Sequence, residues 1–132
     1  MKFEDFDLSP TVLKAIEEQG YTTPTPIQEK CIPLLIAGND LVGCAQTGTG
    51  KTAAFAIPIV QHLNRLGGSD KKAKKIRCLV VTPTRELAVQ IGQNFDAYGM
   101  FTHLNQLTVF GGVSQVPQVD VLKKGVDVLL ST

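Results

Sequence analysis

The stretch that decides the fold of this chain is residues 45–52, with the sequence AQTGTGKT. A short apolar run at 40–45 leads into it and a helical pattern from Lys51 to about Leu66 follows, which is the strand–loop–helix setting of a phosphate-binding loop. Glycines let backbone N–H groups converge on phosphate oxygens, and the helix N-terminus adds a partial positive charge. The pattern predicts that Lys51 reaches the β- and γ-phosphates of a nucleotide and that the Thr52 hydroxyl ligates Mg²⁺.

The loop departs from the generic pattern at one position, because Ala45 stands where a glycine is usual. A rival interpretation is the dinucleotide fingerprint G-x-G-x-x-G/A, which Gly48, Gly50 and Ala53 satisfy. That fingerprint expects an acidic residue at the end of the next strand, whereas the candidate, Asp70, lies in a lysine-rich loop. The rival also leaves the lysine of the loop without a role, and we therefore reject it.

Outward from the loop, short apolar runs alternate with helical patterns along the chain. The apolar runs predict strands at 40–45, 78–81, 107–110 and 126–130. The helical patterns predict helices at 10–19, 25–37, 51–66, 84–98 and 115–124, the second of them broken at Pro33. Continuous apolar strands that alternate with helices predict an α/β fold, with a parallel sheet covered by helices on both faces.

Composition and charge restrict the classes of protein. The 132 residues suggest one domain, and a composition of 43% hydrophobic and 19% charged residues argues against disorder. Because 13 Lys and Arg face 12 Asp and Glu, the net charge is +1 and any nucleic-acid site must be local. The three cysteines form no CxxC pair, which predicts no zinc site and favours a reduced, cytosolic compartment. The N-terminus is no signal peptide, and no apolar run is long enough to span a bilayer.

A second segment of interest is residues 20–28, with the sequence GYTTPTPIQ. The Gln28 amide could pair with the N6 and N7 edge of adenine, and Tyr21 could stack on the base. The pattern Thr25-x-x-Gln28 is equally that of a capping box at a helix start. Taken alone, the segment favours the capping interpretation.

A third segment, residues 82–90, has the sequence TPTRELAVQ and connects a strand end to a helix start. Backbone N–H groups, the Thr84 hydroxyl and Arg85 could grip a nucleic-acid backbone there. An N-cap with a solvated Arg–Glu pair is the alternative. Gly111 and Gly112 could likewise let the backbone approach a ligand closely, or could form only a turn.

Together these segments resemble one family, the DEAD-box ATP-dependent RNA helicases, in their first RecA-like domain. Phe3 matches the isolated aromatic residue upstream of the family's adenine-sensing Q motif, and residues 20–28 match the Q motif itself. Residues 45–52 match its phosphate loop, including the alanine. Residues 83–90 match its RNA-contacting PTRELAxQ segment, and Gly111–Gly112 match its GG motif. The resemblance covers nearly the whole chain.

The resemblance implies ATP and Mg²⁺ as cofactors, sequence-independent contacts to the RNA backbone, a second RecA-like domain as partner, and a cytoplasmic location without a membrane. The implied nucleotide-binding residues are Phe3, Tyr21, Gln28, Ala45, Gln46, Thr47, Gly48, Thr49, Gly50, Lys51 and Thr52. Among them Lys51 and Thr52 are implied to be catalytic, with Thr52 as the metal ligand. The implied RNA-binding residues are Pro83, Thr84, Arg85, Gly111 and Gly112.

Several parts of the family pattern do not occur, because the chain contains no Asp-Glu-Ala-Asp or Ser-Ala-Thr sequence and no second domain with its arginine finger. We therefore expect residues 1–132 to be the N-terminal part of the first RecA-like ATP-binding domain, incomplete at the C-terminus, with the Q motif region at 1–29. The parent protein is expected to couple ATP hydrolysis to RNA duplex unwinding, and this chain to be inactive alone. Its phosphate-loop strand is expected to have unpaired edges.

Two alternatives stay open. One is a module that binds ATP or RNA without catalysis. The other is a different P-loop NTPase, such as a nucleotide kinase, against which the match of residues 20–28 to the Q motif argues.

Overall fold

The computed structural model describes residues 1–66, 75–109, 122 and 125–132. The helices are the 3-10 helix η1 (Phe3–Phe6) and the α-helices α1 (Pro10–Glu18), α2 (Pro26–Ile36), α3 (Lys51–Arg65) and α4 (Arg85–Tyr98). The strands are β1 (Cys78–Val81), β2 (Gln106–Val109) and β3 (Val128–Ser131). The helix predicted at 115–124 lies, apart from Leu122, outside the described residues.

The described strands form a parallel sheet in the order β1-β3-β2. Val128 at the start of β3 is in register with Cys78 of β1 on one side and with Gln106 of β2 on the other. Parallel strands of one sheet require crossover connections, and α4 lies in the crossover from β1 to β2, which flank β3 on its two sides. The parallel sheet and the α/β class predicted from the sequence are therefore confirmed.

The strand predicted at 40–45 does not form, so that prediction is wrong for this chain. Residues 41–46 carry no regular secondary structure, and the side chain of Val42 is 94% exposed. A strand is stable only when its backbone groups pair, and no strand in the described part of the chain is paired with this segment. The apolar side chains of residues 41–46 therefore indicate that this segment is suited to a buried position, which the described residues do not cover.

The break predicted at Pro33 is also wrong, because α2 continues through this residue to Ile36. Proline removes one N–H from the helical ladder, and the carbonyl four residues earlier loses its donor. Pro33 lies on the exposed side of α2, where water can replace that donor. The helix therefore tolerates the residue.

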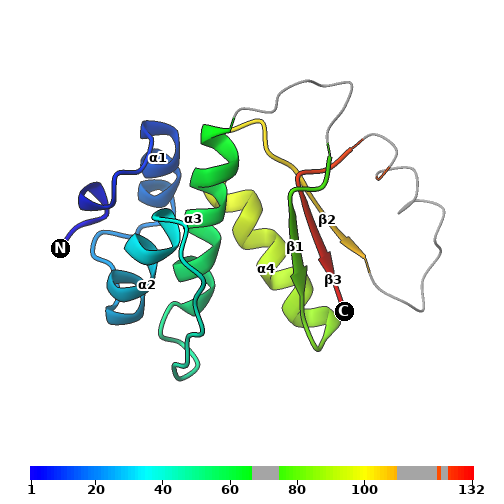
Figure 1. Cartoon of the computed structure of the whole chain (residues 1–132), viewed down its shortest axis with the longest axis horizontal. Helices are drawn as coiled ribbons and strands as arrows, with labels where there is room; N and C mark the ends of the chain where they lie inside the picture. The colour runs from blue at the N-terminus through cyan, green and yellow to red at the C-terminus, as the bar shows by residue number, and fades with distance from the viewer. Residues whose placement is uncertain (67–74, 110–121, 123–124) are drawn as a thin grey trace.

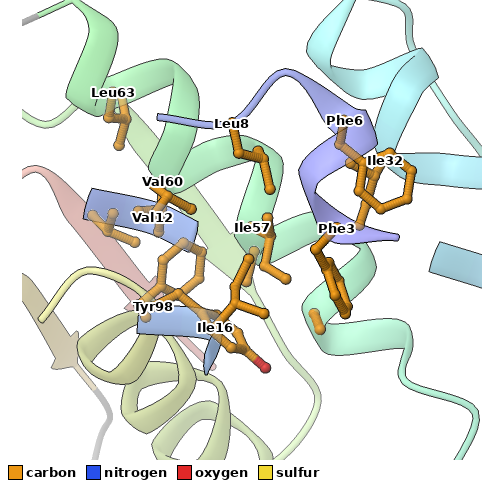
Figure 2. Packing of buried hydrophobic residues seen from close by; sticks show 14 of the residues in the cluster. Phe3, Phe6, Leu8, Val12, Ile16, Ile32, Ile57, Val60, Leu63 and Tyr98 are labelled. Carbon is orange, nitrogen blue, oxygen red and sulfur yellow. The ribbon is translucent and has the colours of Figure 1, made fainter. Parts of the chain in front are cut away.

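The hydrophobic core lies mainly among the helices, and Figure 2 shows side chains of η1, α1, α2, α3 and α4 packed together. Helix α3 is at its centre, and its buried residues are Ala53, Ala54, Ala56, Ile57, Pro58, Val60, Gln61 and Leu63. Val128 and Leu130 of β3 extend the same cluster to the sheet. Each fully buried aliphatic side chain of this kind contributes roughly 1.5–3 kcal/mol, so α3 is held firmly from several sides.

This arrangement brings the ends of strands and helices together on one side of the molecule. The carboxyl ends of the parallel strands point toward the same end as the N-termini of α3 and α4 (Figure 1). Open parallel sheets bind ligands at the carboxyl edge, where helix N-termini gather. Among the described residues, no helix combines the length and the apolar character that crossing a membrane would need.

Candidate phosphate-binding site

The loop at 45–52 enters α3 through two glycines in the left-handed conformation. Gly48 and Gly50 both have φ of +84°, which an L-residue adopts only at a cost of roughly 1–2 kcal/mol. Gly50 is the N-cap residue of α3, and the Ala54 N–H donates to its carbonyl at 3.2 Å. The N–H groups earlier in this first turn have no intrahelical acceptor, and an anion can accept from them.

Lys51 folds back across the loop that precedes it. Its Nζ donates to the carbonyl of Ala45 at 2.6 Å, and the side chain is exposed. The Thr49 hydroxyl donates to the carbonyl of Gln46 at 2.7 Å, which closes the turn, and Thr52 is half-buried at the start of α3. A neutral carbonyl is a weaker acceptor for an ammonium group than a phosphate oxygen, so phosphate can displace Ala45 from Lys51.

The start of α2 is bound directly to this loop. The Thr25 hydroxyl donates to the carbonyl of Thr49 at 2.8 Å, and the Gln28 Nε2 donates to the carbonyl of Gly50 at 3.2 Å. A Cβ on Gly50 would overlap the Gln28 amide, so glycine is required there for space as well as for its φ. Segments more than twenty residues apart in sequence thus share one hydrogen-bonded cluster.

The same two side chains form the predicted capping box of α2. The Thr25 N–H donates to the Gln28 Oε1 at 3.0 Å, and the Gln28 N–H donates to the Thr25 hydroxyl at 3.4 Å. The capping interpretation is therefore confirmed. The sequence pattern alone missed the two bonds to the phosphate loop, because nothing in local spacing indicates partners 22 and 24 residues away.

Gln28 keeps hydrogen-bonding capacity after these contacts. An amide group has two donor hydrogens and two acceptor lone pairs, and the contacts with Thr25 and Gly50 use one of each. The remaining donor and acceptor are the pair that the N7 and N6 positions of adenine require. Gln28 is 4% exposed, so reading a base would require the ligand to reach an amide set into the protein surface.

The aromatic residues implicated in base contact lie together, at different depths. Phe3 is buried in the core, and its ring stacks with Tyr21 at a centroid distance of 6.5 Å and an interplanar angle of 21°. Tyr21 is 40% exposed and also receives a hydrogen bond from the Tyr98 hydroxyl at 3.4 Å. Tyr21 is therefore the member of the pair that can reach a ligand, whereas Phe3 supports it from beneath.

The segment proposed to grip nucleic acid lies at the carboxyl end of β1. Thr84 is the N-cap of α4, and its hydroxyl accepts from the Leu87 N–H at 3.2 Å. Pro83, Thr84 and Arg85 are all exposed at this end. The buried Thr82 holds the turn from below, because its hydroxyl donates to the Thr84 carbonyl at 3.0 Å. The N-cap part of the alternative is thus confirmed at Thr84, and Pro83, Thr84 and Arg85 remain exposed around it.

Gly111 and Gly112, the remaining predicted RNA-binding residues, lie outside the described residues. Their place in the sequence is just beyond β2, whose carboxyl end lies beside that of β3. Their predicted role stays a prediction.

A buried carboxylate lies at the amino ends of the strands, away from the carboxyl ends described above. Asp127 immediately precedes β3, is 1% exposed, and accepts from the Arg77 guanidinium at 2.8 Å. Its second oxygen accepts from the Asn105 N–H at 3.0 Å. Arg77 is the residue before β1, and Asn105 is the residue before β2. The Asp127 carboxylate therefore links the amino ends of the three strands. This position is remote from the loop at 45–52 and gives Asp127 a structural role.

The described side chains do not by themselves build a metal centre. Among residues 1–66, 75–109, 122 and 125–132, no group of three or more His, Cys, Asp and Glu could hold an ion. Mg²⁺ in nucleotide sites is held largely by phosphate oxygens and water, with one or two protein ligands. The donor set of the loop, first-turn amides with Lys51 and the Thr52 hydroxyl, therefore fits a nucleotide with its own Mg²⁺ rather than a resident metal.

Comparison with known proteins gives consistent matches. A family model described as DEAD/DEAH box helicase matches residues 25–132. The chain is 47% identical over 131 residues to the ATP-dependent RNA helicase SrmB of Haemophilus influenzae. It is 45% identical over 130 residues to the DEAD-box ATP-dependent RNA helicase RhpA of Helicobacter pylori.

A solved structure also matches nearly the whole chain. The RNA helicase Prp28 from Chaetomium thermophilum, bound to ADP, aligns with a TM-score of 0.86 and 32% sequence identity over 98% of this chain. This likeness confirms the predicted RecA-like fold. The chain covers 31% of the Prp28 chain, and it spans 29% and 25% of the two sequence relatives, so it corresponds to under a third of their length.

Proposed function

Because this chain belongs to the DEAD/DEAH box helicase family, we propose that the protein containing it is an ATP-dependent RNA helicase. In this proposal residues 1–132 are the N-terminal part of its first RecA-like domain, with the Q motif region at 1–29. They supply the ATP-binding loop and part of the RNA-binding surface. A second RecA-like domain completes the enzyme, and the protein acts in the cytoplasm, which the free state of Cys31, Cys44 and Cys78 supports.

The observation that carries this proposal is the hydrogen-bonded cluster of Thr25, Gln28, Thr49 and Gly50. A phosphate loop by itself is shared by NTPases of many kinds. Here the start of α2 is hydrogen-bonded to two consecutive carbonyls of the loop, so in this proposal nucleobase recognition and phosphate binding would belong to one hydrogen-bonded unit. That combination supports an adenine nucleotide, and it argues against an unrelated P-loop enzyme.

The loop residues have distinct tasks in this proposal. Amides of the first turn of α3 and the Lys51 ammonium would hold the β- and γ-phosphates, and the Thr52 hydroxyl would give the accompanying Mg²⁺ one ligand. The bound metal supplies charge neutralisation at the phosphates. The remaining donor and acceptor of Gln28 would take the adenine edge, and the exposed ring of Tyr21 would pack against the base.

RNA contact is assigned to the same end of the molecule. Pro83, Thr84 and Arg85 are exposed at the carboxyl end of β1, where the N-terminus of α4 also favours phosphate. Contacts of this kind neutralise backbone charge without reading bases, which suits a helicase that acts on many sequences. Arg85 is the residue that supplies the positive charge in this segment.

The proposal is tested by strand displacement with a full-length protein that contains this chain. A labelled RNA duplex with a single-stranded overhang should separate in the presence of ATP and Mg²⁺, and ATP without Mg²⁺ should give no separation. The protein with Lys51→Ala should leave the duplex intact while still binding single-stranded RNA. Separation that is independent of ATP, or retained in Lys51→Ala, would refute the assignment.

A further inference from the structure

We propose that Tyr98 is a positioning residue that fixes the exposed ring of Tyr21 through its hydroxyl, and so ties α4 to the base side of the nucleotide site. The inference rests on the proposed function, because Tyr21 is assigned to the nucleobase there. It assigns a role to a residue that no sequence motif singled out. The supporting observations are the burial of Tyr98, its contact with Tyr21, and its place in α4.

Tyr21 is held between two other aromatic rings. Phe3 stacks on it with a centroid distance of 6.5 Å, and the Tyr98 ring lies 6.2 Å away at an interplanar angle of 45°. The Tyr98 hydroxyl donates to the Tyr21 hydroxyl at 3.4 Å. A ring with contacts from two sides and a bond at its tip keeps little rotamer freedom, so less entropy is lost when a base packs against it.

The hydroxyl of Tyr98 is not needed for packing. The side chain is 1% exposed and lies in the hydrophobic cluster beside Val12 and Ile16 (Figure 2). Phenylalanine would fill this space without bringing a polar group that must find a partner inside the protein. The hydroxyl reaches Tyr21, which is thus the partner that accounts for a tyrosine at this position.

The protonated state of this donor is secure. Burial raises the pKa of Tyr98 above its ordinary value, and the hydrogen bond with Tyr21 raises the pKa further. The Tyr98 hydroxyl therefore stays protonated at neutral pH and can donate this hydrogen bond.

Helix α4 connects this contact to the RNA-binding segment. Arg85 is its first residue and Tyr98 its last, so the two lie about 20 Å apart on one rigid element. A displacement of α4 on RNA binding would move the Tyr98 hydroxyl together with the helix. The orientation of Tyr21, and with it the affinity for the base, would then respond to RNA.

The test uses a full-length protein that contains this chain and compares Tyr98→Phe, Tyr21→Phe and the double variant with the unchanged sequence. Each single substitution removes the same hydrogen bond and keeps the ring. Affinity is measured for a non-hydrolysable ATP analogue, with and without single-stranded RNA, and for inorganic tripolyphosphate, which has no base. Thermal unfolding is recorded for every variant.

Tyr98→Phe should weaken binding of the ATP analogue by about 2- to 10-fold and leave tripolyphosphate binding unchanged. The double variant should be no weaker than either single variant, since both remove one bond. The increase in analogue affinity that RNA brings should also shrink in Tyr98→Phe.

Unchanged analogue affinity in Tyr98→Phe, or losses that add in the double variant, would overturn the inference and leave the proposed function intact. Equal losses for the analogue and tripolyphosphate would also overturn it, because they would indicate a general structural effect. No binding of the analogue by the unchanged protein would refute the proposed function and this inference with it.

Discussion

At the scale of single residues, Gln28 serves both the fold and the site. Its Oε1 caps α2 through the Thr25 N–H, while its Nε2 donates to the carbonyl of Gly50 in the phosphate loop. Thr25 shares both tasks, because its hydroxyl caps the helix and donates to the Thr49 carbonyl. Only Gln28 retains the donor and acceptor that could read adenine. The roles of Thr25 and Gln28 can therefore be distinguished by how a substitution of each changes the ratio of ATP to GTP affinity.

Thr25→Val should weaken ATP and GTP binding by a similar factor, because it loosens the loop without touching the base. Gln28→Ala should weaken ATP more than GTP, because it also removes the adenine contact. Both should lower the free energy of unfolding by about 1 kcal/mol through the lost cap. Competition binding of ATP and GTP, with a melting curve for each variant, measures all three quantities.

Comparison of Thr25→Val with Gln28→Ala also shows which result would contradict the assignment of Gln28 to adenine. If Gln28→Ala and Thr25→Val change the ratio of ATP to GTP affinity equally, Gln28 acts only as a cap and a tie to the loop. The adenine assignment would then be withdrawn.

At the scale of elements, the start of α4 presents Arg85 beside an N-cap that the helix needs in any case. Arg85→Ala should lower RNA affinity evenly across sequences and reduce the slope of log affinity against log salt by about one. Glu86→Gln, at the next exposed position, is the control for a change of one charge without loss of a phosphate contact. Filter binding over a salt series with two unrelated RNA sequences gives the comparison.

A loss that differs between the two RNA sequences would mean that Arg85 reads bases. A gain of affinity of equal size in Glu86→Gln would mean that general charge, not a contact, is responsible for the loss in Arg85→Ala. Either result would remove Arg85 from the proposed backbone grip.

The amino ends of the strands are held together by the ion pair between Asp127 and Arg77, at 2.8 Å. Asp127→Asn keeps the shape of the side chain and removes its charge. Because Arg77 is partly solvated, we expect a loss of roughly 2–3 kcal/mol rather than the larger cost of a fully buried pair. Hydrogen exchange of the amides of β1, β2 and β3 in the full-length protein measures this loss.

Asp96→Asn is the control. Within the described residues, the hydrogen bond that Asp96 accepts is an exposed one, from the Gln106 side chain at 3.1 Å. Asp96→Asn should change exchange by less than about 0.5 kcal/mol. Equal protection of the strands in Asp127→Asn and Asp96→Asn would show that the pair does not hold the sheet together.

Around the candidate site, the features predicted correctly from sequence are turns and caps with local signals. The glycine-rich turn, the N-cap at Thr84 and the capping box at Thr25 each occupy a few consecutive residues, and the structure has them as predicted. The bond from Gln28 to Gly50, the burial of Phe3 and the role of Asp127 depend on segments brought together by folding. No spacing rule along the chain indicates such partners.

At the scale of the whole molecule, an apolar groove separates the phosphate-loop segment from the sheet. Two adjoining pockets of about 260 and 300 Å³ share Leu35 and Phe55 and extend from Leu41 to Cys78 along α3. Val42 beside them is 94% exposed. Apolar strand-like segments with unpaired backbone groups favour association between chains.

The 132-residue chain by itself should therefore self-associate at micromolar concentration. Val42→Lys should reduce this association, because a charge at an exposed edge disfavours pairing between chains. Glu18→Gln, at the exposed end of α1, is the control for the same one-unit change of net charge elsewhere. Sedimentation velocity over a concentration series distinguishes the variants, and a monodisperse monomer of the unchanged chain would contradict the expectation.

The central claim is the proposal that, in the whole enzyme, the loop at 45–52 binds the phosphates of ATP for a reaction that RNA stimulates. The most direct measurement is steady-state ATP hydrolysis by a full-length protein that contains this chain, with and without single-stranded RNA. Hydrolysis should rise with RNA, and Lys51→Ala should abolish it, because the β- and γ-phosphate charge loses its partner. Near-normal, RNA-stimulated turnover in Lys51→Ala would contradict the claim.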